Sequence, residues 1–161
     1  MTSVGELLEH LAGMPRFIGE CADRVPPAEW TRQPGPGLFS LVEHCCHLRD
    51  LEEEGYTLRL RRMLREERPV LDDFDGGAVA ARRNYPGQDL AAAMQAFAEA
   101  RARNLAVLSG LDDAALVRTA TLGEHGTITV QRLAELMAEH DASHRGELEA
   151  LLASLGHPTR R

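Results

Sequence analysis

One stretch near the C-terminal end, residues 129–156, has the clearest repeating pattern in the chain and limits the folds it can adopt. At 3.6 residues per turn its apolar positions fall on one side of a helix. Thr129 suits the N-cap, and Gly156 with Pro158 beyond it is typical of a helix end. We therefore expect one long amphipathic helix, whose buried stripe is Leu133, Met137, His140, His144, Leu148, Leu151 and Leu155.

Two positions of that stripe, 140 and 144, hold histidine where leucine would be expected. Burying a polar side chain without a hydrogen bond or ligand costs about 1–3 kcal/mol, so both rings need partners. A pair at i and i+4 points both side chains the same way, which is a common geometry for binding one metal ion. From these two residues alone, metal ligands and satisfied core histidines remain equally good interpretations.

Three further segments have helical periodicity, at about residues 3–24, 40–67 and 89–109. The first is weakened in its middle by Pro15 and neighbouring glycines. The second begins at Ser40, which forms a capping box with Glu43. No long segment alternates with period two, and the connection 110–128 has room for a short hairpin or a turn. The sequence predicts a single all-α domain over residues 1–161, a four-helix bundle with long inter-helix connections.

Composition excludes several classes of function. The net charge of −7 argues against nucleic acid or an anionic membrane as the main partner. The chain has no lysine, which removes Schiff-base chemistry. No secretory signal or membrane-spanning run is visible, and the three cysteines form no disulfide framework, so we expect a cytoplasmic protein.

A third metal ligand is expected from another helix, because two histidines alone would bind an ion weakly. The second helix offers His44 and His47. If Leu41, Leu48, Leu51 and Leu58 form its buried stripe, His44 lies near the centre and His47 toward the edge. Periodicity slightly favours His44 and leaves both open.

The second helical segment, FSLVEHCCHLRDLE, resembles the (W/F)-S-x-x-E-x-x-x-H-L-x-D-x-E element of the DinB/YfiT-like superfamily. TITVQRLAELMAEHDASHRGELEAL resembles its H-x-x-x-H element, and the segment between them has the usual form of the superfamily. The resemblance implies the DinB/YfiT-like four-helix bundle and a divalent metal held by His47, His140 and His144. His44 then becomes a neighbour of the site. Zinc is the first candidate because neutral imidazoles suit it, and nickel, iron and copper suit the same ligands.

The resemblance also implies a range of activities. Three histidines leave the ion open positions for water or substrate, as in catalytic sites. Relatives include thiol S-transferases that use bacillithiol or mycothiol, and proteins described as metal-dependent hydrolases. We expect an enzyme of one of these kinds, acting on a small molecule with a low-molecular-weight thiol as one candidate. The alternative is a non-catalytic bundle whose metal fastens two helices or whose pocket binds a small molecule.

Neighbouring polar residues are candidates for supporting roles. Glu147 stands where the family often has glutamine, and a carboxylate there would orient His144 or change what the pocket accepts. Asp141 and Asp50 are candidate acceptors for histidine N–H groups, and solvated helix charges are an equally good interpretation. The run Glu52–Glu54 is expected to be exposed.

Two further expectations concern the residues that line a pocket and a face for packing against a second copy. Pocket residues are expected from the loops 25–38 and 110–128. The alanine-rich face of the third helix, residues 91–102, would allow close packing of a second copy as a homodimer.

Overall fold

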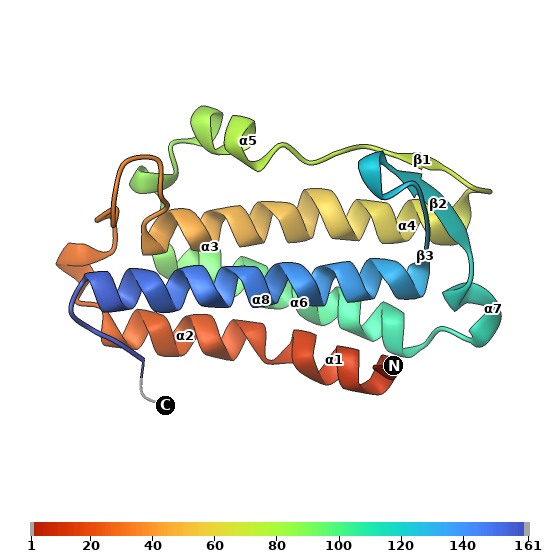
Figure 1. Ribbon diagram of the computed structural model, residues 1–161, viewed down its shortest axis with the longest axis horizontal. Coiled ribbons are helices and arrows are strands. Elements are labelled where there is room, and N and C mark those ends of the chain that lie inside the picture. The colour runs from red at the N-terminus through yellow and green to blue at the C-terminus, as the bar shows by residue number, and fades with distance from the viewer. Residues whose placement is uncertain (1, 160–161) are drawn as a thin grey trace.

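The computed structural model describes residues 2–159 as four long helical rods lying side by side (Figure 1). This confirms the predicted all-α four-helix bundle. The first rod is α1 (Val4–Ala12) and α2 (Met14–Arg24); the second is α3 (Leu41–Asp50), the π-helical turn η2 (Leu51–Tyr56) and α4 (Thr57–Arg65); the third is α6 (Leu90–Ser109); the fourth is α8 (Val130–Ser154).

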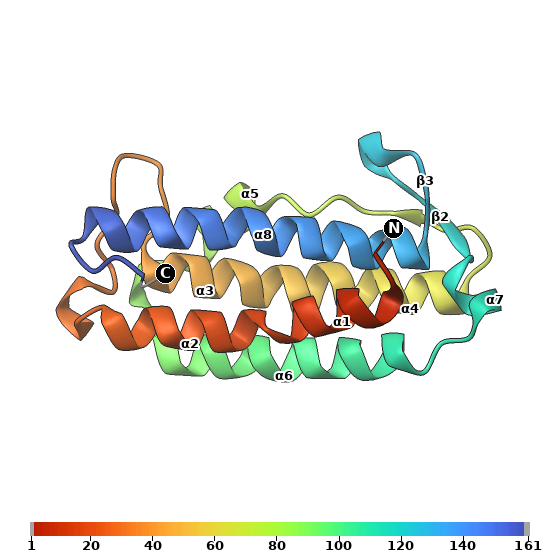
Figure 2. The same cartoon turned by 60° about the horizontal axis from the view of Figure 1, so that its bottom comes forward.

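The second and third rods run in the same direction, so the chain returns along the outside of the bundle between them (Figure 1). This crossover holds β1 (Val70–Leu71), α5 (Gly76–Arg83) and the short helix η3 (Tyr85–Gly87). Turning the molecule shows the first rod and α6 together on one side, with α8 on the other (Figure 2). Both the first and the second rod pack against α6 and α8.

A small three-stranded sheet lies at one end of the bundle. The connection before α8 holds α7 (Asp113–Leu116), β2 (Thr119–Leu122), the turn η4 (Gly123–His125) and β3 (Thr127–Thr129). β2 and β3 form a hairpin, one of the two possibilities that the sequence left open for this connection, and β1 adds to β2 in parallel. The sequence did not indicate β1, because a strand of two residues is too short to show alternation.

The first rod is interrupted where the sequence predicted one continuous helix. α1 ends at Ala12 and α2 begins at Met14, with Gly13 between them. Pro15 lacks an N–H group, and its ring clashes with the carbonyl four residues earlier, so the helix breaks there. Another short helix, η1 (Pro27–Glu29), follows in the loop after α2.

The π-helical turn η2 changes which face of the second rod is buried. The predicted stripe holds for its first three leucines, but Leu58 is 41% exposed. A π turn contains an extra residue, so later residues are rotated relative to an unbroken α-helix. Leu60 and Met63 fill the interior instead, and the expectation for Leu58 was wrong.

Two apolar clusters form the core, one toward each end of the bundle. One includes Leu41, Phe97 and Leu151, and the other includes Met63 and Met137. Between them lies a layer of buried polar residues: His44, His47, Asp50, Glu52, Arg101, Asn104, Asp141 and His144. No helix within residues 2–159 is both long and apolar enough to cross a membrane.

Candidate metal centre

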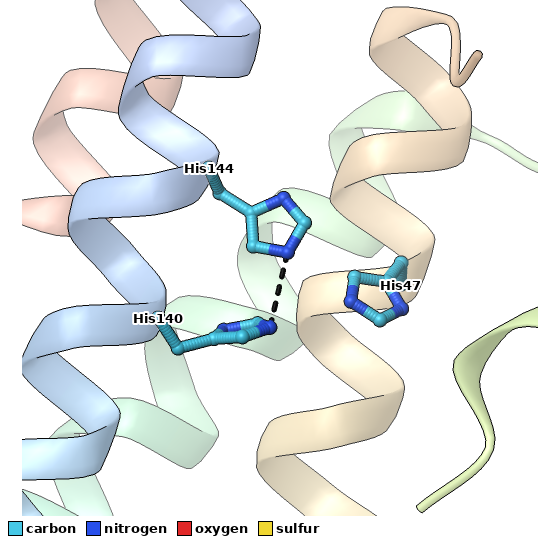
Figure 3. Close-up of side chains that lie close together, drawn as sticks. All are labelled: His47, His140 and His144. Carbon is cyan, nitrogen blue, oxygen red and sulfur yellow. Dashed lines mark hydrogen bonds between the residues drawn. The ribbon is translucent and has the colours of Figure 1, made fainter.

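Three histidines meet in the middle of the bundle. His47 comes from α3, and His140 and His144 come from successive turns of α8. Figure 3 shows the three rings turned toward one another. Their ligand atoms all lie within 4.8 Å of one another, and the Nε2 atoms of His140 and His144 are 3.0 Å apart. Two helices thus present three imidazole nitrogens to one point.

These rings are neutral at physiological pH. Burial, with a further contribution from the neighbouring histidines, lowers the pKa of His47 to about 4 and of His140 to about 3. Burial also lowers the pKa of His144. A neutral imidazole has the free lone pair that a metal ion requires, whereas a protonated one has none.

Two of the ring nitrogens in this cluster lack partners. The Nδ1 atoms of His47 and His144 are buried and have no hydrogen-bond partner within residues 2–159. Since most buried side-chain polar atoms are satisfied, such atoms call for an explanation. A donor set of three neutral, clustered imidazoles fits a divalent metal ion.

His44 and Glu147 adjoin this cluster on the side of His144. Glu147 Oε2 lies 3.3 Å from His144 Nδ1 and 4.0 Å from His44 Nε2. The 3.3 Å contact is close, but it does not have the geometry of a hydrogen bond. His44, His144 and Glu147 form a second group able to hold an ion, and it shares His144 with the first. The histidine that periodicity favoured therefore lies directly beside the three-histidine cluster.

Asp141 pairs with Arg101 and makes no hydrogen bond to a histidine within residues 2–159. Its two carboxylate oxygens accept hydrogen bonds from Arg101 at 2.7 and 3.1 Å. Arg101 also donates to both carboxylate oxygens of Glu52 and to the carbonyl of Leu11. This Arg101 network, defined as Arg101, Glu52, Asp141, Asn104 and the carbonyl of Leu11, links all four rods.

Sequence reasoning missed this network. Glu52 was expected to be exposed with its two neighbours, and it is 1% exposed. A signal was present, because Arg101 lies at helical spacing between Phe97 and Leu108 on the buried stripe of α6. An arginine on such a stripe needs buried carboxylate partners, but spacing along one helix does not identify them.

Aromatic rings and the crossover surround the histidines. The ring of Phe39 lies 5.6 Å from those of both His44 and His47, and Phe74 lies 6.3 Å from His47. A Cβ atom at Gly76 would lie 2.7 Å from Cε1 of His47, so only glycine fits there in this arrangement.

Hydrogen bonds hold the crossover in place. The Tyr85 hydroxyl donates to Asp50 at 2.5 Å, and Arg49 donates to the same carboxylate. Asp50 therefore anchors the crossover to α3, and its hydrogen bonds within the described residues are not to a histidine.

A cavity of about 650 Å³ opens beside His144. The expected loop 25–38 contributes to it, but the connection 110–128 lies at the opposite end of the bundle, so that expectation was wrong (Figure 1). The lining residues are Pro34, Gly37, Leu38, Phe39, His44, His144, Glu147, Ala150, Leu151 and Ser154.

Comparisons with known proteins agree with this architecture. The sequence matches the family described as the DinB superfamily over residues 6–148. Among solved structures it is similar to YfiT from Bacillus subtilis, described as a probable metal-dependent hydrolase with an unusual four-helix bundle topology. That similarity has a TM-score of 0.87 at 19% identity and covers 97% of this chain and 91% of the other. No curated protein matches the sequence.

Proposed function

We propose that this chain, which belongs to the DinB superfamily, is a metal-dependent enzyme whose ion is held by His47, His140 and His144. The observation that carries the proposal is the meeting of three neutral imidazoles within 4.8 Å in a layer between two apolar clusters. Zinc is the first candidate, and nickel, iron and copper are alternatives. YfiT, which shares the fold, is itself described as a probable metal-dependent hydrolase.

The proposed reaction is hydrolysis or thiol S-transfer on a small molecule. A divalent ion with open positions lowers the pKa of bound water, or holds a thiol as thiolate, and so supplies a nucleophile near neutral pH. The surrounding residues orient and shield that centre. Glu147 is placed to accept the Nδ1 proton of His144 after a small movement, which would fix the ring with Nε2 toward the ion.

Phe39 and Phe74 limit the approach of bulk water to His47 from two sides. Gly76 allows the crossover to lie directly against the same ring. Exclusion of water strengthens electrostatic interactions at the reacting atoms. These residues support a centre in which the ion acts on substrate, whereas an ion that only joined α3 to α8 would need no neighbouring cavity.

The test is metal analysis of tag-free protein together with His144→Ala. We expect one divalent ion per native chain, and loss of that ion and of any hydrolase or thiol-transferase turnover in the variant. Comparing the variant with metal-free native protein separates the loss of the ion from the loss of packing around the buried His144 ring. The control is His125→Ala, an exposed histidine in η4.

Two results would contradict the proposal. Native, tag-free protein without a stoichiometric ion would exclude the three-histidine metal centre. A variant that keeps its ion would show that His144 is not a ligand. If the ion is present but metal loss only lowers the melting temperature and no turnover is found, the ion fastens helices and the enzymatic proposal is wrong.

A further inference from the structure

The cavity beside His144 has apolar walls. Leu38 and Phe39 come from the loop before α3, and Leu151 comes from α8. Leu38 is 56% exposed, which leaves its side chain free to contact a ligand. A volume of about 650 Å³ is typical of sites for small organic molecules.

Only one residue that lines the cavity is acidic. That residue is Glu147, whose side chain is 54% exposed. The other titratable residues of the lining are His44 and His144. Glu147 is therefore the one carboxylate of a lining that contains no arginine or lysine.

This carboxylate lacks a cationic partner in the protein. Across residues 2–159, no arginine lies within 4.0 Å of Glu147, although many other acidic residues pair with one. Its two close neighbours are the imidazole rings of His44 and His144. A carboxylate in this setting attracts a cation and repels an anion.

A second polar side chain, His44, lies at the same end of the cavity, with its Nε2 4.0 Å from Glu147 Oε2. His44 is 3% exposed, and its Nδ1 has no hydrogen-bond partner in the described part of the chain. Its ring is held edge-on against Phe39, with centroids 5.6 Å apart. The cavity thus has a polar end, formed by Glu147 and His44 beside the three histidines, and an apolar remainder.

From this distribution we propose that the cavity binds organic amines with an apolar or aromatic body. The body lies between the loop residues Leu38 and Phe39 and the α8 residue Leu151, and the protonated amine pairs with Glu147. Only what happens to the bound amine rests on the proposed function, because its reactive group would have to reach the three histidines. Binding itself does not require the ion.

The test uses three probes of similar shape and different charge on chelator-treated, metal-free protein. Phenethylamine is cationic, phenethyl alcohol is neutral and hydrocinnamate is anionic. Calorimetry or ligand-observed NMR should give affinities in that order, with the amine bound roughly three- to tenfold more tightly than the alcohol, as for a partly exposed ion pair. Equal or tighter binding of the carboxylate would overturn the proposal.

Matched variants locate the effect. Glu147→Gln keeps the shape of the side chain and removes its charge, so the preference for the amine over the alcohol should disappear while the alcohol still binds. Glu149→Gln, an exposed residue of the same helix outside the cavity lining, should keep the preference. A preference that survives Glu147→Gln would overturn the assignment.

Ala150→Phe provides a second check, because Ala150 is exposed and lines the cavity. The larger ring should fill the space and abolish binding of the amine and the alcohol; unchanged binding would place the site elsewhere. The outcomes are separable from those of the metal test. If native protein holds an ion but the metal-free protein shows no charge preference, only the ligand class is disproved. If native protein holds no ion but the amine preference is found, only the metal centre is disproved.

Discussion

Two buried polar clusters lie in the same layer of the bundle, and they differ in how fully their atoms are satisfied. Arg101 makes five hydrogen bonds, to Glu52, Asp141 and Leu11, which match its five N–H donors. The three-histidine cluster, by contrast, keeps two buried Nδ1 atoms without hydrogen bonds within residues 2–159.

An unsatisfied buried polar atom costs about 1–3 kcal/mol, so a protein retains one only for a reason. The Arg101 network is complete without any added group and joins the four rods, which identifies its role as structural. The histidine cluster is not completed by hydrogen bonds within the protein, and its three neighbouring imidazoles remain available to a ligand such as a metal ion. The difference between the two clusters therefore separates a group that stabilises the fold from one that binds.

The largest expected effect comes from Arg101→Met. Removing the guanidinium leaves two carboxylates buried without their partner, which should cost about 3–5 kcal/mol of unfolding free energy. Urea denaturation of the metal-free native protein and variant measures this loss of unfolding free energy. A loss below about 1 kcal/mol would contradict a structural role for the network.

Because that variant could fail to fold, a triple variant provides a second measurement. Adding Glu52→Gln and Asp141→Asn replaces the stranded carboxylates by neutral amides. We expect recovery of roughly half or more of the lost stability, because the penalty comes from unpaired buried charge. A triple variant no more stable than Arg101→Met would show that packing, not charge, is responsible.

The next effect is acid sensitivity of the metal-free protein. His44, His47 and His140 have pKa values of about 3 to 4 in the folded protein, below the ordinary value of 6.5, chiefly because of burial. At a pH between the folded and the unfolded pKa values, the unfolded chain binds more protons than the folded protein. The free energy of unfolding therefore falls as the pH falls below about 6.5. Above that pH the contribution of these histidines is fully present.

Urea denaturation at a series of pH values measures this dependence. His44→Phe should make the free energy of unfolding depend less steeply on pH between the folded and the unfolded pKa values of the histidines. The variant lacks one buried imidazole that the fold keeps unprotonated. The exposed His125→Asn should leave this pH dependence unchanged. Identical slopes for native protein and His44→Phe would show that His44 is not held neutral by the fold.

The smallest expected effect on stability distinguishes two adjacent glycines in α5. A Cβ at Gly76 would lie 2.7 Å from His47, whereas at Gly77 the nearest atom would be Asp75 Oδ1 at 3.6 Å. Gly76→Ala should cost about 1–3 kcal/mol and weaken metal binding by displacing His47. Gly77→Ala should be neutral or stabilise by up to about 1 kcal/mol. Thermal unfolding and metal titration measure both, and equal behaviour would contradict the close approach to His47.

Much of the fold followed from local pattern. The stripe of the last helix and the capping box at Ser40 gave the long helices, because helix ends and apolar faces depend on nearby residues. The small sheet was only partly foreseen. β1 pairs with β2 from about fifty positions away, and such pairing leaves little trace in two residues.

The site was predictable where residues lie on one helix and less so where two segments meet. His140 and His144 were identified from spacing, and family resemblance added His47, which the structure brings beside them. The π-helical turn and the partners of Arg101 depend on tertiary contacts, so local periodicity did not indicate them. The approach of Gly76 to His47 depends on the path of the crossover, which also has no local signal.

The Arg101 network has an electrostatic consequence beyond its hydrogen bonds. It contains two carboxylates and one guanidinium, so it retains a negative charge in the interior. Asp141 directly follows His140 in α8, which places that charge next to three imidazoles that contribute none. A divalent cation entering a weakly polar interior loses hydration energy, and a nearby anionic group offsets part of that loss. The cluster that joins the four rods thus also supplies a counter-charge for an ion bound by the histidines.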